Sequence, residues 1–185
     1  REILLKGKKH GLTPKLHADE ITKFGGAELA AEIGAKSASH LLFASDNGLK
    51  AMKKHGVMAV LLPGASFSLM TGRYADARKM ISWGVPVALG TDYNPSCWIE
   101  SQQIVIALGC HQMRITSSEA IAAATINAAH AINRAQTVGS LEAGKKADIS
   151  VLNAPNHKFL GYRFGTNLID KVVKNGNLIV NDGKR

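Results

Sequence analysis

The feature that most constrains the fold is a repeat in which a short apolar run ends in polar residues that can bind metals or move protons. It occurs four times, at residues 16–20 (LHADE), 39–41 (SHL), 61–64 (LLPG) and 90–95 (GTDYNP). In a parallel α/β barrel the chemistry lies at the carboxyl ends of the strands. A closed barrel needs eight strands. The sequence therefore predicts an α/β fold that is half of a (β/α)8 barrel.

The spacing of strands and helices supports this prediction. Residues 57–62 and 85–89 are continuously apolar, as in a parallel sheet covered on both faces, and residues 12–17 and 38–43 are predicted as two further strands. Strand, loop, helix and glycine recur about every 25 residues, which is typical of right-handed βαβ units. The predicted helices cover residues 27–33, 46–56, 74–83, 100–113 and 117–133, and Asp46 is the predicted cap of the second of them.

The pattern changes towards the C-terminus. Residues 149–152 are predicted as a strand, and residues 172–180 as two strands around Asn175-Gly176, a strong hairpin signal. We expect residues 1–138 to form the half-barrel of a metal-dependent hydrolase. Residues 139–185 are expected to be the C-terminal part of a small β-sandwich domain.

Composition narrows the class of protein. Hydrophobic residues make up 45% of the chain and charged residues 20%, which is typical of a globular domain with a core. No apolar run approaches the roughly 20 residues that span a bilayer. Cys97 and Cys110 form no disulfide framework, so a cytoplasmic location is expected. The chain lacks an initiator Met, which suggests that it begins inside a larger protein.

The net charge of +9 leaves two interpretations. The basic residues could form a surface for nucleic acid or another anion, or they could be scattered, solvated lysines. No aromatic residues are interleaved with them and no nucleic-acid motif is present, so the second interpretation is favoured.

Four residues at the predicted strand ends could carry the chemistry: His17, Glu20, His40 and Asp92. Histidine and carboxylate are ligands for a cation such as zinc, and a catalytic site leaves one position open for water. A metal ion lowers the pKa of bound water towards 7, and a neighbouring carboxylate can act as general base and then acid. Any one of these residues alone could be structural. Strand ends of a parallel barrel converge on one face, so together they indicate one pocket.

Two further residues have alternative interpretations. Cys97 follows Asp92 closely and could line the pocket, or be a small buried thiol. Arg73 follows the third predicted strand and could bind an acidic substrate, or be a solvated residue at a helix start.

These motifs resemble the amidohydrolase superfamily and, within it, the imidazolonepropionase family. The order is His-x-x-Glu, then Ser-His, then Thr-Asp, followed by an Ala-Gly-Lys-x-Ala-Asp element. The matching stretches are residues 17–20, 25–32, 39–41, 59–64, 91–95 and 125–129.

The resemblance implies hydrolytic opening of the ring of 4-imidazolone-5-propanoate to N-formimino-L-glutamate, a step of histidine degradation. It implies one divalent metal ion, zinc or iron, held by His17 and Asp92. Glu20, His40 and Asp92 are implied as catalytic residues, with Glu20 also contacting the substrate. Asn94, Ser96 and Cys97 are implied to bind the substrate, although the family usually has Gly at the position of Ser96.

The sequence departs from the superfamily by lacking a His-x-His pair, which supplies two further ligands. The partners expected are therefore the small-molecule substrate, the missing N-terminal half of the barrel and a second subunit in a homodimer, without nucleic acid or membrane. Two alternatives stay open: an amino-heterocycle deaminase of the same superfamily, or a non-catalytic half-barrel that needs a partner half.

Overall fold

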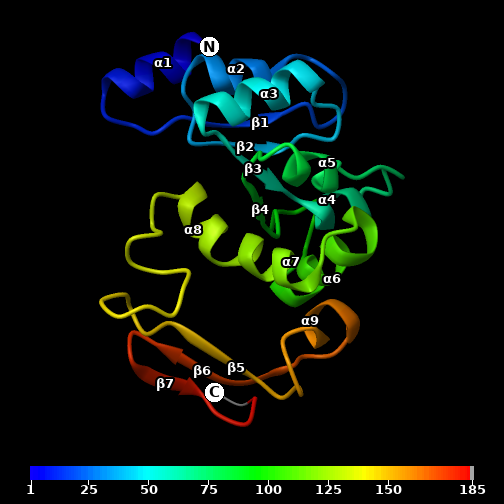
Figure 1. Ribbon diagram of the computed structural model, residues 1–185, viewed down its shortest axis with the longest axis vertical. Coiled ribbons are helices and arrows are strands. Elements are labelled where there is room, and N and C mark those ends of the chain that lie inside the picture. Colours follow the sequence, from blue (N-terminus) through cyan, green and yellow to red (C-terminus); the bar gives the residue numbers. More distant parts are fainter. Residues whose placement is uncertain (184–185) are drawn as a thin grey trace.

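The computed structural model describes residues 1–183 and contains two separate β-sheets, the first of them surrounded by helices (Figure 1). The strands are β1 (Lys15–Ala18), β2 (Ser37–His40), β3 (Met58–Leu61), β4 (Val87–Leu89), β5 (Ile149–Leu152), β6 (Ile169–Lys174) and β7 (Asn177–Val180). The helices are α1 (Glu2–Lys9), α2 (Gly26–Glu32), α3 (Asp46–His55), α4 (Pro63–Ser68), α5 (Ala77–Ser82), α6 (Gln102–Met113), α7 (Ser117–Ala124), α8 (Ile126–Ala131) and α9 (Phe159–Tyr162). Within residues 1–183, no helix is long and apolar enough to cross a membrane.

The first sheet is the predicted half-barrel sheet. Its four strands lie in the order β1-β2-β3-β4, and every neighbouring pair is parallel. Ala18 lies opposite His40, so β1 and β2 end level with each other. All four strand carboxyl ends therefore lie on one edge, and the prediction of four parallel strands is confirmed.

The core explains why β3 and β4 are apolar throughout, whereas β1 and β2 also contain polar residues. Ala38, Ala59 and Leu61 are completely buried. Helix α2 packs on β1 and β2, whereas α7 and α8 pack against β4. β3 and β4 are buried along nearly their whole length, and continuous apolar runs follow from that, whereas Lys15 and His17 on β1 are exposed.

One predicted helix cap and one predicted helix start are wrong. Helix α3 is capped by Ser45, whose hydroxyl accepts a hydrogen bond from the Gly48 amide at 2.9 Å, while Asp46 is already helical. Helix α5 begins at Ala77 and not at residue 74, because Asp76 is its N-cap and accepts from the Lys79 amide at 3.0 Å.

The single helix predicted over residues 117–133 is also wrong, because it is divided into α7 and α8. Thr125, between them, has φ −120° and ψ −93°, and its hydroxyl donates to the carbonyl of Ile121 at 2.7 Å. A hydroxyl bonded to the preceding turn bends or ends a helix. Helices α1, α4 and α9 had no counterpart among the predicted elements.

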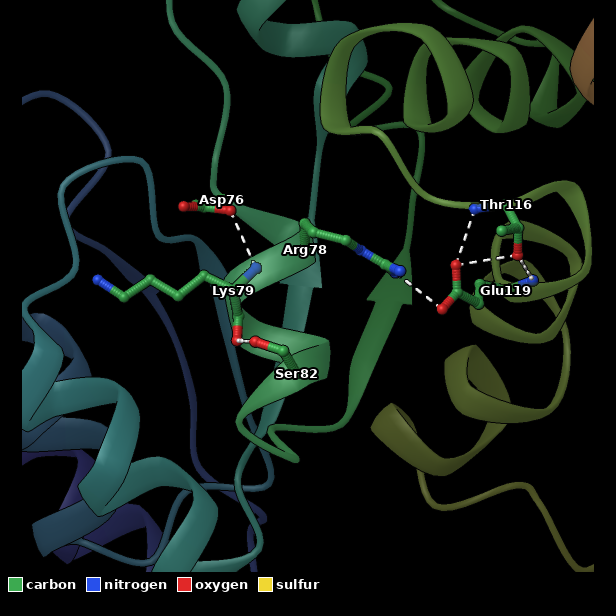
Figure 2. A network of polar contacts seen from close by, with 6 residues as sticks. All are labelled: Asp76, Arg78, Lys79, Ser82, Thr116 and Glu119. Carbon is green, nitrogen blue, oxygen red and sulfur yellow. Dashed lines mark hydrogen bonds and ion pairs between the residues drawn. The ribbon is translucent and has the colours of Figure 1, made fainter.

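A polar network joins α5 to α7 (Figure 2). Arg78 of α5 pairs with the Glu119 carboxylate at 2.8 Å. The other oxygen of Glu119 accepts from the Thr116 amide at 2.8 Å, and the Thr116 hydroxyl accepts from the Glu119 amide, which makes a capping box. One carboxylate therefore caps α7 and fixes it to α5.

The outer edge of β4 is partly satisfied by side chains. The Pro86 carbonyl and the Gly90 amide form hydrogen bonds with β3, so the backbone groups of Val87 and Leu89 face away from β3. The Val87 carbonyl accepts from the Asn127 side chain at 2.8 Å, and that of Leu89 accepts from Gln102 at 3.4 Å.

The second sheet is antiparallel in the order β5-β6-β7. The hairpin between β6 and β7 is confirmed, with Asn175 at φ 50° and Gly176 at φ 84°, as a two-residue hairpin turn requires. Helix α9 packs on α6 and α7, so the C-terminal segment contacts the half-barrel. The division at residue 138 stays a prediction.

Candidate metal centre

The ends of β1 and β2 turn sharply where the candidate residues lie. Asp19, His40 and Leu41 have φ values of 48°, 72° and 63°, and Asp92, which follows β4, has φ 55°. Residues other than glycine are strained in this left-handed region, and such strain is concentrated at functional sites. The carboxyl edge of the sheet is therefore shaped by backbone conformations that residues other than glycine rarely adopt.

Three side chains from β1, its following loop and β2 come together at this edge. His17 Nδ1 lies 3.0 Å from His40 Nε2, and the two ring centroids are 4.9 Å apart. Glu20 Oε2 lies 3.5 Å from the same Nε2. One ligand atom from each residue lies within 4.8 Å of those of the other two.

The three residues differ in burial. The His40 side chain is 2% exposed and that of Glu20 is 33% exposed, whereas His17 is exposed. Burial lowers the pKa of His40, against the raising effects of Glu20 and Asp92, and His17 lowers it further. His40 is therefore neutral at neutral pH and keeps either a lone pair or an N–H available at Nε2.

The cluster fits a metal ion in its donor set and its spacing. Two imidazole nitrogens and a carboxylate oxygen suit a divalent transition metal. Ligand atoms within 4.8 Å of one another can all approach one ion at about 2 Å with small movements. Asp92 lies outside this group of three, although its charge acts on His40.

The loop after β4 is ordered around Asn94. Its side-chain amide donates to the Asp92 carbonyl at 2.7 Å, and its side-chain oxygen accepts from the amides of Ser96 and Cys97 at 2.8 and 3.1 Å. Asn94 thereby shapes the segment that carries Asp92. Ser96 is exposed.

Cys97 is 1% exposed, and its thiol donates to the Thr91 carbonyl at 3.6 Å. Burial raises the pKa of Cys97, and the charge of Asp92 adds to the rise. The side chain is therefore an uncharged thiol packed inside this loop. Substrate binding by Asn94, Ser96 and Cys97 stays a prediction.

Two residues near the centre have roles that the sequence did not assign. Arg73 Nε donates to the Leu42 carbonyl at 3.0 Å, and its guanidinium lies 4.4 Å from the Phe43 ring, so it joins the loops after β3 and β2. Asp19 is 6% exposed and accepts hydrogen bonds from backbone amides at the start of α2. No local sequence signal marks this contact, because the two amides lie seven and eight residues further along the chain.

Curated relatives resemble the chain along its whole length. An imidazolonepropionase of Geobacillus thermodenitrificans is 58% identical over 185 residues, which is 100% of this chain and 43% of that protein. An imidazolonepropionase of Alkaliphilus metalliredigens is 52% identical over 185 residues, which is 44% of that protein. The chain thus spans less than half the length of these relatives, and it corresponds to their C-terminal part.

Solved structures share the fold at low identity. An adenosine deaminase from Xanthomonas campestris with bound zinc has a TM-score of 0.84 at 18% identity, over 99% of this chain and 48% of that one. The ochratoxinase of A. niger has a TM-score of 0.79 at 22% identity, over 98% of this chain and 44% of that one. The sequence model of the Amidohydrolase family matches residues 5–179 of this chain. The chain belongs to the amidohydrolase family.

Proposed function

We propose that this chain is the C-terminal part of a metal-dependent imidazolonepropionase, which hydrolyses 4-imidazolone-5-propanoate to N-formimino-L-glutamate. The observation that carries the proposal is identity of 58% and 52%, over all 185 residues, to two proteins named imidazolonepropionase. The cluster of His17, Glu20 and His40 at the strand ends supports it.

His17 and Asp92 are proposed to hold one divalent ion, zinc or iron. Such an ion supplies Lewis-acid polarisation and activates water at neutral pH. The rest of the chemistry belongs to the side chains. The reaction adds water to the ring carbonyl carbon, breaks the adjacent C–N bond and delivers a proton to the ring nitrogen.

Glu20 is proposed to move that proton. Its carboxylate accepts a proton from the attacking water and returns it to the departing nitrogen, as general base and then acid. His40, kept neutral by burial, donates from Nε2 to the carbonyl oxygen as negative charge develops there. The 3.5 Å between Glu20 Oε2 and His40 Nε2 lets both residues contact the same small substrate.

The remaining ligands are proposed to come from outside this chain, because its sequence contains no His-x-His pair. A second segment that completes the barrel would supply them, and the assembled protein is proposed to form a homodimer. His17, which is exposed here, would then be covered.

A substrate comparison tests the function. A protein of the relatives' full length, with this chain as its C-terminal part, is assayed on 4-imidazolone-5-propanoate and on amino-heterocycles such as cytosine and adenosine. Ring opening without ammonia release from the amines is expected. Turnover of an amine alone would assign the protein to the deaminases, and turnover of neither would leave a non-catalytic half-barrel.

Metal content separates the proposed ligands from the catalytic residues. His17→Ala and Asp92→Ala are expected to lose the ion in mass spectrometry, whereas His40→Ala keeps it and loses turnover. Loss of the ion from His40→Ala would make His40 a ligand, a role that its 3.0 Å approach to His17 also allows.

A further inference from the structure

Asp19 is a buried carboxylate that the proposed chemistry does not use. It lies between His17 and Glu20, is 6% exposed, and has a left-handed backbone with φ 48°. A buried charge is costly without hydrogen-bond partners. Its partners therefore indicate what it does.

The carboxylate accepts three backbone hydrogen bonds. Oδ1 accepts from the amides of Phe24 and Gly26 at 2.9 and 3.0 Å, and Oδ2 accepts from the amide of Ala27 at 2.9 Å. Gly26 and Ala27 are the first residues of α2, which has no cap from its own N-cap residue, Gly25. Asp19 thus caps this helix from a distance of seven to eight residues along the chain.

Asp19 also holds its surroundings through its backbone and through close packing. Its carbonyl accepts from the Phe43 amide at 2.9 Å, in the loop that follows β2. A Cβ on Gly26 would lie 2.8 Å from Ala18 Cβ and 3.2 Å from the Asp19 amide, so helix and strand approach each other as closely as a glycine permits.

The loop that carries Glu20 depends on this anchor. Residues 20–25 connect β1 to α2, and Ile21 and Phe24 are 82% and 92% exposed, so packing does not hold the loop. Among the described residues, the only backbone hydrogen bond that fixes residues 21–24 is the one from Phe24 to Asp19.

We propose that Asp19 is a positioning residue, which holds the loop so that the Glu20 carboxylate stays within reach of His40. The inference rests on the proposed function for the role of Glu20. The anchoring itself requires only that the Asp19 side chain turns towards α2, which leaves Glu20 to face the metal centre. A carboxylate suits this place because it accepts at both oxygens, whereas one half of an Asn amide would point a donor at a donor.

The test compares substitutions in the full-length protein. Asp19→Asn is expected to keep the metal ion and lower kcat roughly 10- to 100-fold with a smaller change in KM, as for other residues that orient catalytic groups. The kcat of Asp19→Gly should fall further, because glycine tolerates the left-handed backbone but offers no hydrogen-bond acceptor. Partial activity in the Asn variant relative to the Gly variant is the rescue that a positioning role predicts.

Asp76→Asn is the matched control. Asp76 caps α5 through the Lys79 amide and is exposed. Asn caps a helix about as well as Asp, so this substitution removes the charge of a capping residue and should leave kcat unchanged. Equal loss of kcat in both variants, or unchanged kcat in Asp19→Gly, would overturn the inference.

Hydrogen exchange separates this inference from the proposed function. In Asp19→Gly the amides of Phe24, Gly26 and Ala27 should exchange about tenfold faster, in line with the loss of a buried hydrogen bond. This readout does not need the substrate. Wild-type protein inactive on imidazolone propanoate would refute the function alone, whereas unchanged exchange would refute the anchoring by Asp19.

Discussion

At the scale of single residues, the centre combines a shielded histidine with a carboxylate that water can still reach. His40 is 2% exposed and Glu20 33% exposed, at 3.5 Å from each other. The proposed general acid–base takes its proton from a water molecule, so water must reach it, whereas a residue that binds a developing charge works best away from bulk water. The two environments match the two proposed roles.

Glu20→Gln is the first prediction at this scale. The variant should keep its metal ion and lose most of kcat, since a general acid–base contributes roughly 10²–10⁴-fold. Steady-state kinetics and metal analysis of the full-length protein measure both quantities. Glu32→Gln, at the exposed end of α2, is the matched control and should have normal kinetics. Loss of the ion from Glu20→Gln would instead make Glu20 a ligand.

Gly26→Ala is the second prediction. The new methyl group would lie 2.8 Å from Ala18 Cβ and 2.9 Å from Ala18 Cα, and a strand backbone cannot yield easily. We expect a loss of about 1–3 kcal/mol in the free energy of unfolding, measured with urea. Gly7→Ala in α1, whose nearest contacts would be an ordinary 3.6 and 3.8 Å, is the control and should be neutral or slightly stabilising. A neutral Gly26→Ala would show that the close approach is not needed.

The residues of the centre could be predicted where strand periodicity places them. His17 and His40 lie in apolar runs whose polar ends were visible in the sequence. Asp19 was missed because its partners are amides five to eight residues further along, and nothing in local composition records that contact.

At the scale of elements, β3 and β4 were predictable because they are buried along nearly their whole length, which leaves an apolar run, whereas helix ends depend on single hydrogen bonds. The break at Thr125 lies within an Ala-rich stretch that continues on both sides, so no change of pattern marks it. Ser45 caps α3 in place of Asp46, and both residues are good caps by type. Geometry, and not propensity, decides between neighbours of equal preference.

Glu119 gives a pH prediction at this scale. The Thr116 amide, followed by Arg78, holds the pKa of Glu119 below its ordinary value of 4.5. Folding thus favours the ionised form, and the stabilisation is present above pH 4.5 and lost as pH falls through the lowered pKa. Glu119→Gln should lower the free energy of unfolding by up to about 1 kcal/mol at pH 7, and the difference should shrink in acid.

A double-mutant cycle with Arg78→Ala is the control for this prediction, because it separates the ion pair between α5 and α7 from the helix cap (Figure 2). Gln can still accept from the Thr116 amide, so the cap should survive the substitution. A wild-type advantage that does not change between pH 7 and pH 3 would show that the charge of Glu119 is not what stabilises the protein.

At the scale of the whole molecule, the described chain has a complete core but an incomplete pocket. The sheet ends at β1 and β4, and within residues 1–183 only the β4 edge has side chains bonded to its carbonyls. Seven large apolar side chains are exposed in the segments that follow the carboxyl ends of β1, β3 and β4: Ile21, Phe24, Phe67, Leu69, Met70, Tyr93 and Trp98. Exposed apolar groups that follow the strand carboxyl ends indicate a surface that is covered in the functional protein.

The last prediction follows from this incompleteness. The 185-residue chain alone should not hydrolyse imidazolone propanoate at an enzymatic rate, because the ligands expected from a His-x-His pair are absent and one wall of the pocket is open. Substrate orientation, which supplies much of an enzyme's rate, would be lost with that wall. The free β1 edge and the apolar loops should instead cause association, visible as dimers or larger species in light scattering.

The N-terminal part of a full-length relative, added in trans, should restore both metal binding and turnover, whereas the same part carrying Ala in place of its His-x-His histidines should restore neither. A monomeric 185-residue chain that turns over the substrate unaided would show that four strands suffice for the site.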